Sequence, residues 1–326
     1  MLDWRNDSHL VVDGVDFVLG PTDLDSVRRA EVDAGALLLR KHRWMVEQYE
    51  AMPVPPAANV FELGIYEGGS TALIALLLRP RRLVAVDLKS NRTSTLDHFI
   101  TARGLQENVH PHYGVDQSDR ARVDEIVHAE FGTEPLDLVI DDASHLLAET
   151  TASFNALFPR LRAGGLFVIE DWSWQHDRER LVKKRLRSDP EARETMARRL
   201  ATDPEAGDAL ARHFALNPED GEALAQHLAS DPTARAALAR QLESSPEARE
   251  ALARRPESGP PSPPNDSLSR LALELVLAAA YADGIVAEVM SVRAGWLIVR
   301  RGDATVDPAT FDISECYGQL GRALLT

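Results

Sequence analysis

The feature that most constrains the fold is a regular alternation of apolar segments with amphipathic ones between residues 59 and 171. Alternating strands and helices are typical of a parallel sheet with crossover helices. Strands that are covered on both faces are apolar along their whole length, as these segments are. We therefore predict a doubly wound α/β core with five successive strands, at 59–65, 82–88, 108–114, 136–142 and 165–171.

The flanking segments extend this core. Residues 8–19 are apolar around an Asp13-Gly14 turn signal, which predicts a hairpin. Residues 23–51 have the spacing of one or two amphipathic helices, ended by the prolines of 53–56. After the proline-rich stretch 256–266, an apolar helix closed by Gly284 precedes two strands joined at 293–295. The sheet is thus expected to have seven strands and to be Rossmann-like.

Between these parts lies a repeat of 14 residues, marked by Pro190, Pro204, Pro218, Pro232 and Pro246. Proline is tolerated only in the first turn of a helix, so each copy starts a new helix with one narrow apolar stripe. Such helices cannot bury their stripes alone, which predicts a stacked all-α array over 188–257. Its role stays open: a lid over the acceptor site, a subunit interface, a partner site or a spacer.

These observations divide the chain into four parts. We predict an N-terminal hairpin and helical cap over 1–54, and a Rossmann-like core over 55–180. The helical insert and its proline-rich linker take 181–267, and the rest of the core with a C-terminal tail takes 268–326.

Composition excludes several classes of protein. There are 36 Lys and Arg against 51 Asp and Glu, a net charge of -15, which repels nucleic acids and anionic membranes. Cys316 is the single cysteine, which excludes an internal disulfide and a cysteine zinc site. No signal-like N-terminus and no apolar stretch of ~18 residues is present. We expect a cytoplasmic protein without nucleic-acid or membrane partners.

A glycine-rich turn at 61–71, between the first core strand and the following helix, predicts a ligand-binding loop. Tyr66 stands where a dinucleotide fingerprint needs its second glycine, which disfavours a pyrophosphate. Glu62 suits the positively charged end of an amino acid. Asp87 ends the second strand, where a carboxylate can accept both hydroxyls of a ribose.

With these motifs the sequence resembles the class I S-adenosylmethionine-dependent methyltransferases, over roughly residues 55–175 and 268–302. Four ordered motifs, GIYEGGST, GVDQSD, IDDASH and GGLFVIEDW, are similar to those of a narrower group. That group is the metal-dependent sugar O-methyltransferases of the macrocin and mycinamicin type, with their relative in cephalosporin biosynthesis.

The resemblance implies S-adenosylmethionine as cofactor and a set of residues around it. The methionine end would lie in the loop of Glu62, Gly64, Tyr66, Gly68 and Ser70. Asp87 would hold the ribose, and Asp116 with Gln117 the region around adenine. Asp141 is expected to face the cofactor or a helix N-terminus.

Three further acids end neighbouring strands: Asp142 ends the fourth, and Glu170 with Asp171 ends the fifth. Such a cluster repels itself unless a hard cation neutralises it, which favours Mg²⁺ or Mn²⁺. The alternative is that these carboxylates are helix caps and solvated loop ends. His145 lies three residues after Asp142, on the same face if a helix starts there, and is the candidate general base. Its alternative role is that of a surface or capping residue.

Trp172 and Trp174 could stack on a sugar or pack beneath the insert. His98, His110 and His112 show no metal-ligand pattern and are interpreted as structural or exposed.

The favoured hypothesis is a divalent-metal-dependent O-methyltransferase acting on a hydroxyl of a small, glycosylated natural product, in a homo-oligomer. Two alternatives remain: a cofactor-binding relative that serves hydroxylation or methoxylation with a partner, and a non-catalytic interaction module built on the repeats.

Overall fold

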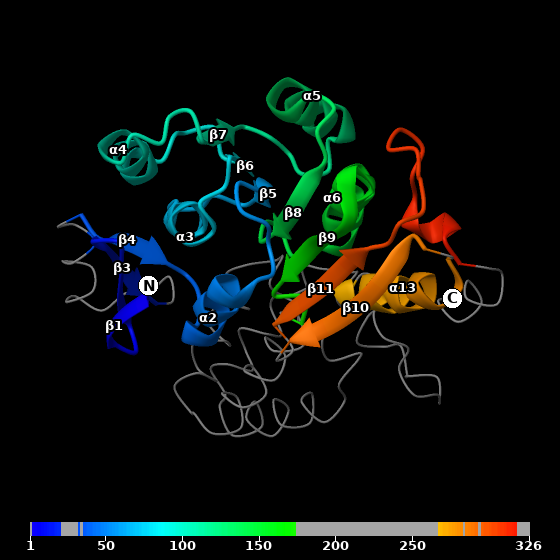
Figure 1. The fold of residues 1–326 in the computed structure, drawn as a ribbon, viewed down its shortest axis with the longest axis horizontal. Helices are drawn as coiled ribbons and strands as arrows, with labels where there is room; N and C mark the ends of the chain where they lie inside the picture. The colour runs from blue at the N-terminus through cyan, green and yellow to red at the C-terminus, as the bar shows by residue number, and fades with distance from the viewer. Residues whose placement is uncertain are drawn as a thin grey trace, which may run out of the picture. The chain divides into compact units, whose positions relative to one another are not determined.

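A seven-stranded, mostly parallel sheet forms the centre of the computed structural model (Figure 1). The structure describes residues 2–20, 32, 35–173, 267–282, 284–292 and 295–317. The order across the sheet is β10 (Val286–Val292), β11 (Trp296–Arg301), β9 (Leu161–Glu170), β8 (Leu136–Asp141), β5 (Asn59–Leu63), β6 (Arg82–Asp87) and β7 (Val109–Tyr113). β11 runs antiparallel to both of its neighbours, and the other six strands run in one direction. The five predicted core strands and the terminal hairpin are confirmed.

Helices cover both faces of this sheet. They are α3 (Gly69–Leu78), α4 (Ser94–Ala102), α5 (Arg120–Phe131), α6 (Leu147–Leu157) and α13 (Leu268–Tyr281). Alternate residues of one strand point to opposite faces, so Val60 joins the apolar cluster of α3 and α4, and Phe61 joins that of α5, α6 and α13. Both side chains are fully buried. This two-sided burial is the reason for the unbroken apolar character of the strands.

A second sheet of four strands lies near the N-terminus, built from β1 (Leu2–Asn6), β2 (His9–Val12), β3 (Val15–Leu19) and β4 (Leu37–Leu39). The predicted hairpin turn at Asp13 and Gly14 is confirmed. The prediction of helix over 23–51 is wrong at 37–39, because these leucines pair in parallel with β3 and two of them are buried. Tertiary pairing overrides the helix propensity of leucine here. Helix α2 (Arg43–Ala51) follows and is confirmed.

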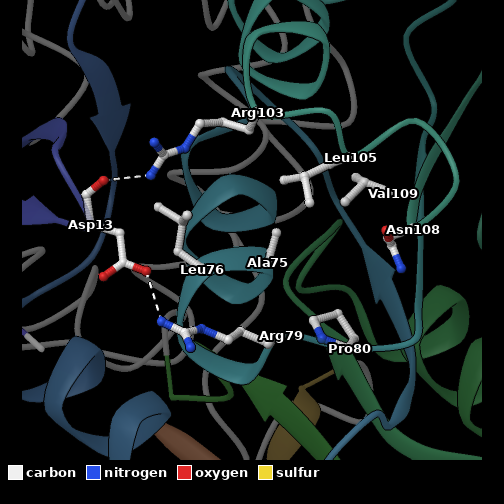
Figure 2. Close-up of a pocket in the computed structure, with 9 residues that line it drawn as sticks. All are labelled: Asp13, Ala75, Leu76, Arg79, Pro80, Arg103, Leu105, Asn108 and Val109. Atoms are coloured by element: carbon white, nitrogen blue, oxygen red, sulfur yellow. Dashed lines mark hydrogen bonds and ion pairs between the residues drawn. The ribbon is translucent and has the colours of Figure 1, made fainter.

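Asp13 connects this sheet to the main one. Its Oδ2 is 2.9 Å from Arg79 Nη2, and its backbone oxygen accepts a hydrogen bond from Arg103. Both arginines line a cavity of about 340 Å³ that also has apolar walls from Leu76 and Val109 (Figure 2). The cavity lies at the end of α3 that is distant from the glycine turn.

The predicted repeat over 188–257 and Trp174 lie outside the described residues. Among the described helices, none has the length and apolar character needed to cross a bilayer.

Candidate active site

The glycine turn connects β5 to α3 and needs its glycines for packing. Gly64 has φ 99°, and a Cβ there would lie 2.3 Å from the carbonyl oxygen of Asp142. Gly68 has φ 84°, and its Cβ would lie 2.6 Å from Cβ of Leu96. The backbone of the turn therefore touches both the end of β8 and helix α4, which a side chain would prevent.

Asp87 holds this turn in place. Its Oδ2 accepts hydrogen bonds from the backbone N–H groups of Ile65 (3.0 Å) and Tyr66 (2.7 Å), and its Oδ1 accepts one from Lys89 N (2.9 Å). The sequence predicted that Asp87 ends its strand, but it did not predict this contact with the loop. These bonds use three of the four lone pairs of the carboxylate, so one lone pair of Oδ1 is left for a ribose hydroxyl, and the predicted contact with the ribose stays a prediction.

Glu62 lies beneath the turn and is fully buried. Its Oε2 accepts a hydrogen bond from Thr71 Oγ1 (2.6 Å), whereas its Oε1 is buried without a hydrogen-bond partner in the described part of the chain. Burial raises the pKa of Glu62 to about 7, although the hydroxyls of Ser70 and Thr71 and the charge of Lys41 lower it. An unsatisfied buried carboxylate oxygen is costly, and an ammonium group from a ligand would satisfy it. Glu62 thus fits the amino end of S-adenosylmethionine.

Asp116, Gln117 and Asp141 do not share one environment. Asp116 is exposed, and its Oδ1 accepts hydrogen bonds from the backbone N–H and the hydroxyl of Ser118. Gln117 is buried, and its Nε2 donates to both oxygens of Asp141 at 3.2 and 3.1 Å. Asp141 also accepts a bond from Ser153 Oγ (2.6 Å), and its burial raises its pKa to about 6.

Gln117 and Asp141 therefore form a polar connection beneath the site. Gln117 Oε1 accepts from Ser144 N at 3.0 Å and so fixes the loop that carries His145. The contacts of Gln117 with Asp141 and Ser144 are thus supporting ones, while the predicted adenine contact of Asp116 and Gln117 stays a prediction.

Asp142, His145 and Asp171 come together at the carboxyl edge of the sheet. One ligand atom of each lies within 4.8 Å of the other two, and His145 Nε2 is 3.8 Å from Asp142 Oδ1. Helix α6 begins only at Leu147, so the proximity of His145 to Asp142 comes from a turn rather than from a shared helix face. The two partly exposed carboxylates are suitable ligands for a hard divalent cation, and the imidazole of His145 lies beside them.

Three residues of the site have left-handed backbone conformations: Tyr66 (φ 50°), His145 (φ 56°) and Asp171 (φ 51°). Such values are uncommon outside glycine and cost free energy, so they persist where surrounding structure imposes them. Three other described residues, Asp13, Ala57 and Arg79, also have positive φ away from this site, so the backbone strain supports the site only together with its side chains.

Sequence reasoning missed Lys41, which reaches the acidic cluster from the segment before α2. Its Nζ lies 2.5 Å from Asp142 Oδ2 and 2.7 Å from Glu170 Oε2. Burial lowers the pKa of Lys41, but the two carboxylates outweigh this effect and hold it above its ordinary value. Glu170 is fully buried and also accepts a hydrogen bond from Tyr49 OH, on α2. A lysine between PVPP and a leucine strand carries no motif, so no local signal could have found it.

Of the three acids predicted as metal ligands, Asp142 and Asp171 thus gather with His145, while Glu170 contacts Lys41 and Tyr49. Trp172 packs against the apolar cluster on the α13 side of the sheet. His110 and His112 both pair with Glu130, and the described residues contain no metal-ligand group that includes them.

Several known proteins are similar to part of this chain. Residues 61–172 match a family model described as a methyltransferase domain. The 8-demethyl-8-alpha-L-rhamnosyl tetracenomycin-C 2'-O-methyltransferase of Streptomyces olivaceus is 34% identical over 134 residues, covering 38% of this chain and 31% of that protein. The demethylmacrocin O-methyltransferase of Streptomyces fradiae is 50% identical over 56 residues, covering 17% of this chain and 13% of that protein. The matches thus span about a third or less of these relatives' length.

Among solved structures, the MycE methyltransferase of the mycinamycin biosynthetic pathway, in complex with Mg, SAH and mycinamycin VI, has a TM-score of 0.39 and 20% identity. The alignment covers 79% of this chain and 48% of that chain.

The family match runs without interruption from the glycine turn through Asp87 and the loop of Asp142 and His145 to Asp171. The residues of the candidate site thus lie within the part of this chain that is similar to a methyltransferase domain.

Proposed function

We propose that this protein transfers a methyl group from S-adenosylmethionine to a hydroxyl of a sugar-bearing small natural product, with the help of Mg²⁺ or Mn²⁺. One observation carries the proposal: the glycine turn and the acidic cluster meet at one sheet edge. The Cα of Gly64 is so close to the Asp142 carbonyl that no side chain fits between them. A group held in the turn and a group held by the acids would therefore be neighbours.

In this proposal Glu62 Oε1 accepts a hydrogen bond from the cofactor's ammonium group, and Asp87 Oδ1 accepts one from a ribose hydroxyl while Asp87 orders the turn. Gly64, Gly68 and Ser70 line the methionine end, with Tyr66 at the exposed side of the loop. Asp116 and Gln117 lie toward adenine. These residues bind and orient the cofactor, and none of them takes part in bond breaking.

The acceptor side is proposed to depend on Asp142 and Asp171, with Glu170 behind them. A divalent cation bound there would raise the acidity of an acceptor hydroxyl. His145 Nε2, 3.8 Å from Asp142 Oδ1, is the group proposed to take the hydroxyl proton. The protein also aligns the acceptor oxygen, the methyl group and the sulfur, and this orientation lowers the barrier to methyl transfer.

The acceptor class rests on the names of the relatives, which act on rhamnosyl tetracenomycin and demethylmacrocin. A glycosylated acceptor is proposed for this chain on that ground, and the homo-oligomeric state and the cytoplasmic location stay predictions.

Calorimetry of the purified full chain tests the proposal. We expect binding of S-adenosylmethionine and of its demethylated product, and no binding of NAD. Methyl transfer to a rhamnosylated acceptor should stop in excess chelator and return with Mg²⁺. Binding of NAD without S-adenosylmethionine would refute the cofactor assignment, and full turnover in chelator would refute the role of the metal.

A further inference from the structure

Lys41 has an unusual position for a lysine, because its ammonium lies inside the acidic cluster rather than in water. Its side chain is 2% exposed, and Nζ contacts Asp142 Oδ2 and Glu170 Oε2 at ion-pair distances. Glu170 is fully buried and is bonded by Tyr49 as well. Water does not screen such a group, so Lys41 is a strong fixed positive charge at this point.

Without Lys41 the acidic cluster would contain only negative charges. Asp142, Glu170 and Asp171 supply three negative charges and Lys41 one positive charge when all are ionised, which leaves two negative charges. Asp142 and Glu170 both contact Lys41 and would repel each other without a cation between them, and for the fully buried Glu170 this repulsion adds to the cost of desolvation.

The two oxygens of Asp142 face different partners. Oδ2 contacts Lys41, whereas Oδ1 faces His145 Nε2 at 3.8 Å, within the group that also includes Asp171. Asp142 therefore belongs to two sites. The first already holds a cation, the ammonium of Lys41, and the second can bind a divalent cation.

We infer that Lys41 is an internal counter-cation: it occupies the place of a metal ion between Asp142 and Glu170, so that the acidic cluster folds without a divalent ion. This inference rests on the proposed metal site. Its consequence is that folding of the wild-type protein does not need the metal. A second consequence is weakened metal binding, since the ammonium repels a dication on the other side of Asp142.

The test removes the charge and keeps an unbranched side chain that is one atom shorter, in Lys41→Met. Thermal melting of the full chain is measured in chelator and in Mg²⁺. The wild-type protein should melt at nearly the same temperature in both solutions. Lys41→Met should melt at a clearly lower temperature in chelator and recover in Mg²⁺. Titration with Mn²⁺ should show binding to Lys41→Met at least tenfold tighter than to the wild type.

Two further variants separate charge from packing. Arg162→Met removes another ion pair between β9 and β8, Arg162 Nε to Asp137 Oδ1 at 2.6 Å, at the opposite end of these strands. Its loss of stability should be the same with and without Mg²⁺. The double variant Lys41→Met with Glu170→Gln removes the unpaired buried acid and should melt in chelator closer to the wild type than Lys41→Met does.

Several outcomes overturn the inference. It is wrong if Lys41→Met melts as the wild type does in both solutions, or is unfolded in both, because the metal then cannot replace the ammonium. It is also wrong if the double variant stays as unstable as Lys41→Met. If the wild type binds Mn²⁺ and Lys41→Met binds it no more tightly, this inference alone fails. If neither protein binds Mn²⁺, the metal part of the proposed function fails first.

Discussion

The glycine turn and the acidic cluster are adjacent in space but built in different ways. The turn takes its parts from a short stretch of sequence, since Glu62, Gly64, Gly68 and Thr71 follow one another within ten residues. The cluster collects its groups over long separations, with 101 residues between Lys41 and Asp142 and 129 between Lys41 and Glu170. A local signal therefore identifies the first region, and only the fold identifies all of the second.

This difference also separates what the two regions need in order to work. The turn is shaped by backbone contacts, and its key side chain, Glu62, is a single buried acid with one unsatisfied oxygen. The cluster is shaped by side-chain charges that must balance one another. Mutations in the turn should affect cofactor affinity, whereas mutations in the cluster should affect metal dependence and turnover.

The largest effect is expected at His145, where a mutation should change turnover strongly and cofactor binding little. His145→Ala should lower kcat by ~10² to 10⁴, the usual contribution of general acid–base catalysis. Affinity for the demethylated cofactor, measured by calorimetry, should stay within about twofold of the wild-type affinity. His98→Ala, an exposed histidine on α4, is the matched control and should leave kcat unchanged. Wild-type turnover in His145→Ala would return this residue to a capping or surface role.

Asp142→Asn tests the proposed metal ligands of the cluster. A metal ion that polarises a reacting oxygen contributes several kcal/mol, so we expect a loss of turnover of ~10² to 10³ and little response to Mg²⁺. Cofactor binding should persist, because the turn contacts the backbone oxygen of Asp142 and not its carboxylate. Equal losses of cofactor binding and turnover would contradict the division between the two regions.

Glu62→Gln should weaken binding of the demethylated cofactor about ten- to a hundredfold, because a hydrogen bond between charged groups contributes roughly 1.5–3 kcal/mol. The pKa of Glu62 is about 7 in the free protein, so the carboxyl is ionised above this pH and must lose a proton before it can accept the ammonium below it. Wild-type affinity should thus fall by up to about tenfold per pH unit below pH 7. Calorimetry at several pH values should show that this dependence is absent in Glu62→Gln and present in Glu67→Gln, the exposed neighbour.

The smallest effect is expected away from both regions. Asp13→Ala removes the carboxylate that pairs with Arg79 but leaves the backbone oxygen that accepts from Arg103. Because Arg79 is 76% exposed, the pair should contribute less than about 1 kcal/mol to the free energy of unfolding. Urea denaturation measures this, and unchanged turnover would show that the first sheet holds Lys41 in place without this contact.

Most of the central sheet could be predicted because hydrophobic pattern and chain order determine it. Strand ends place Asp87, Asp142 and Asp171 at one edge as soon as the sheet is known to be parallel. The strand at Leu37–Leu39 could not be predicted, since a short leucine run has no period and its pairing with β3 is a tertiary choice. Nor could the turn geometry of His145, because its left-handed backbone follows from contacts such as that of Gln117 with Ser144.

The long separations within the acidic cluster have a consequence for the order of folding. Strands β5 to β9 can pair once residues 59–170 are available, but Lys41 has no carboxylate partner until β8 and β9 are both in place. Closing loops of this length is entropically slow compared with forming a hairpin. The segment that is synthesised before the rest of the site is therefore the one whose contacts are completed last, and during refolding the acidic cluster should bind a divalent ion more tightly before Lys41 docks than afterwards.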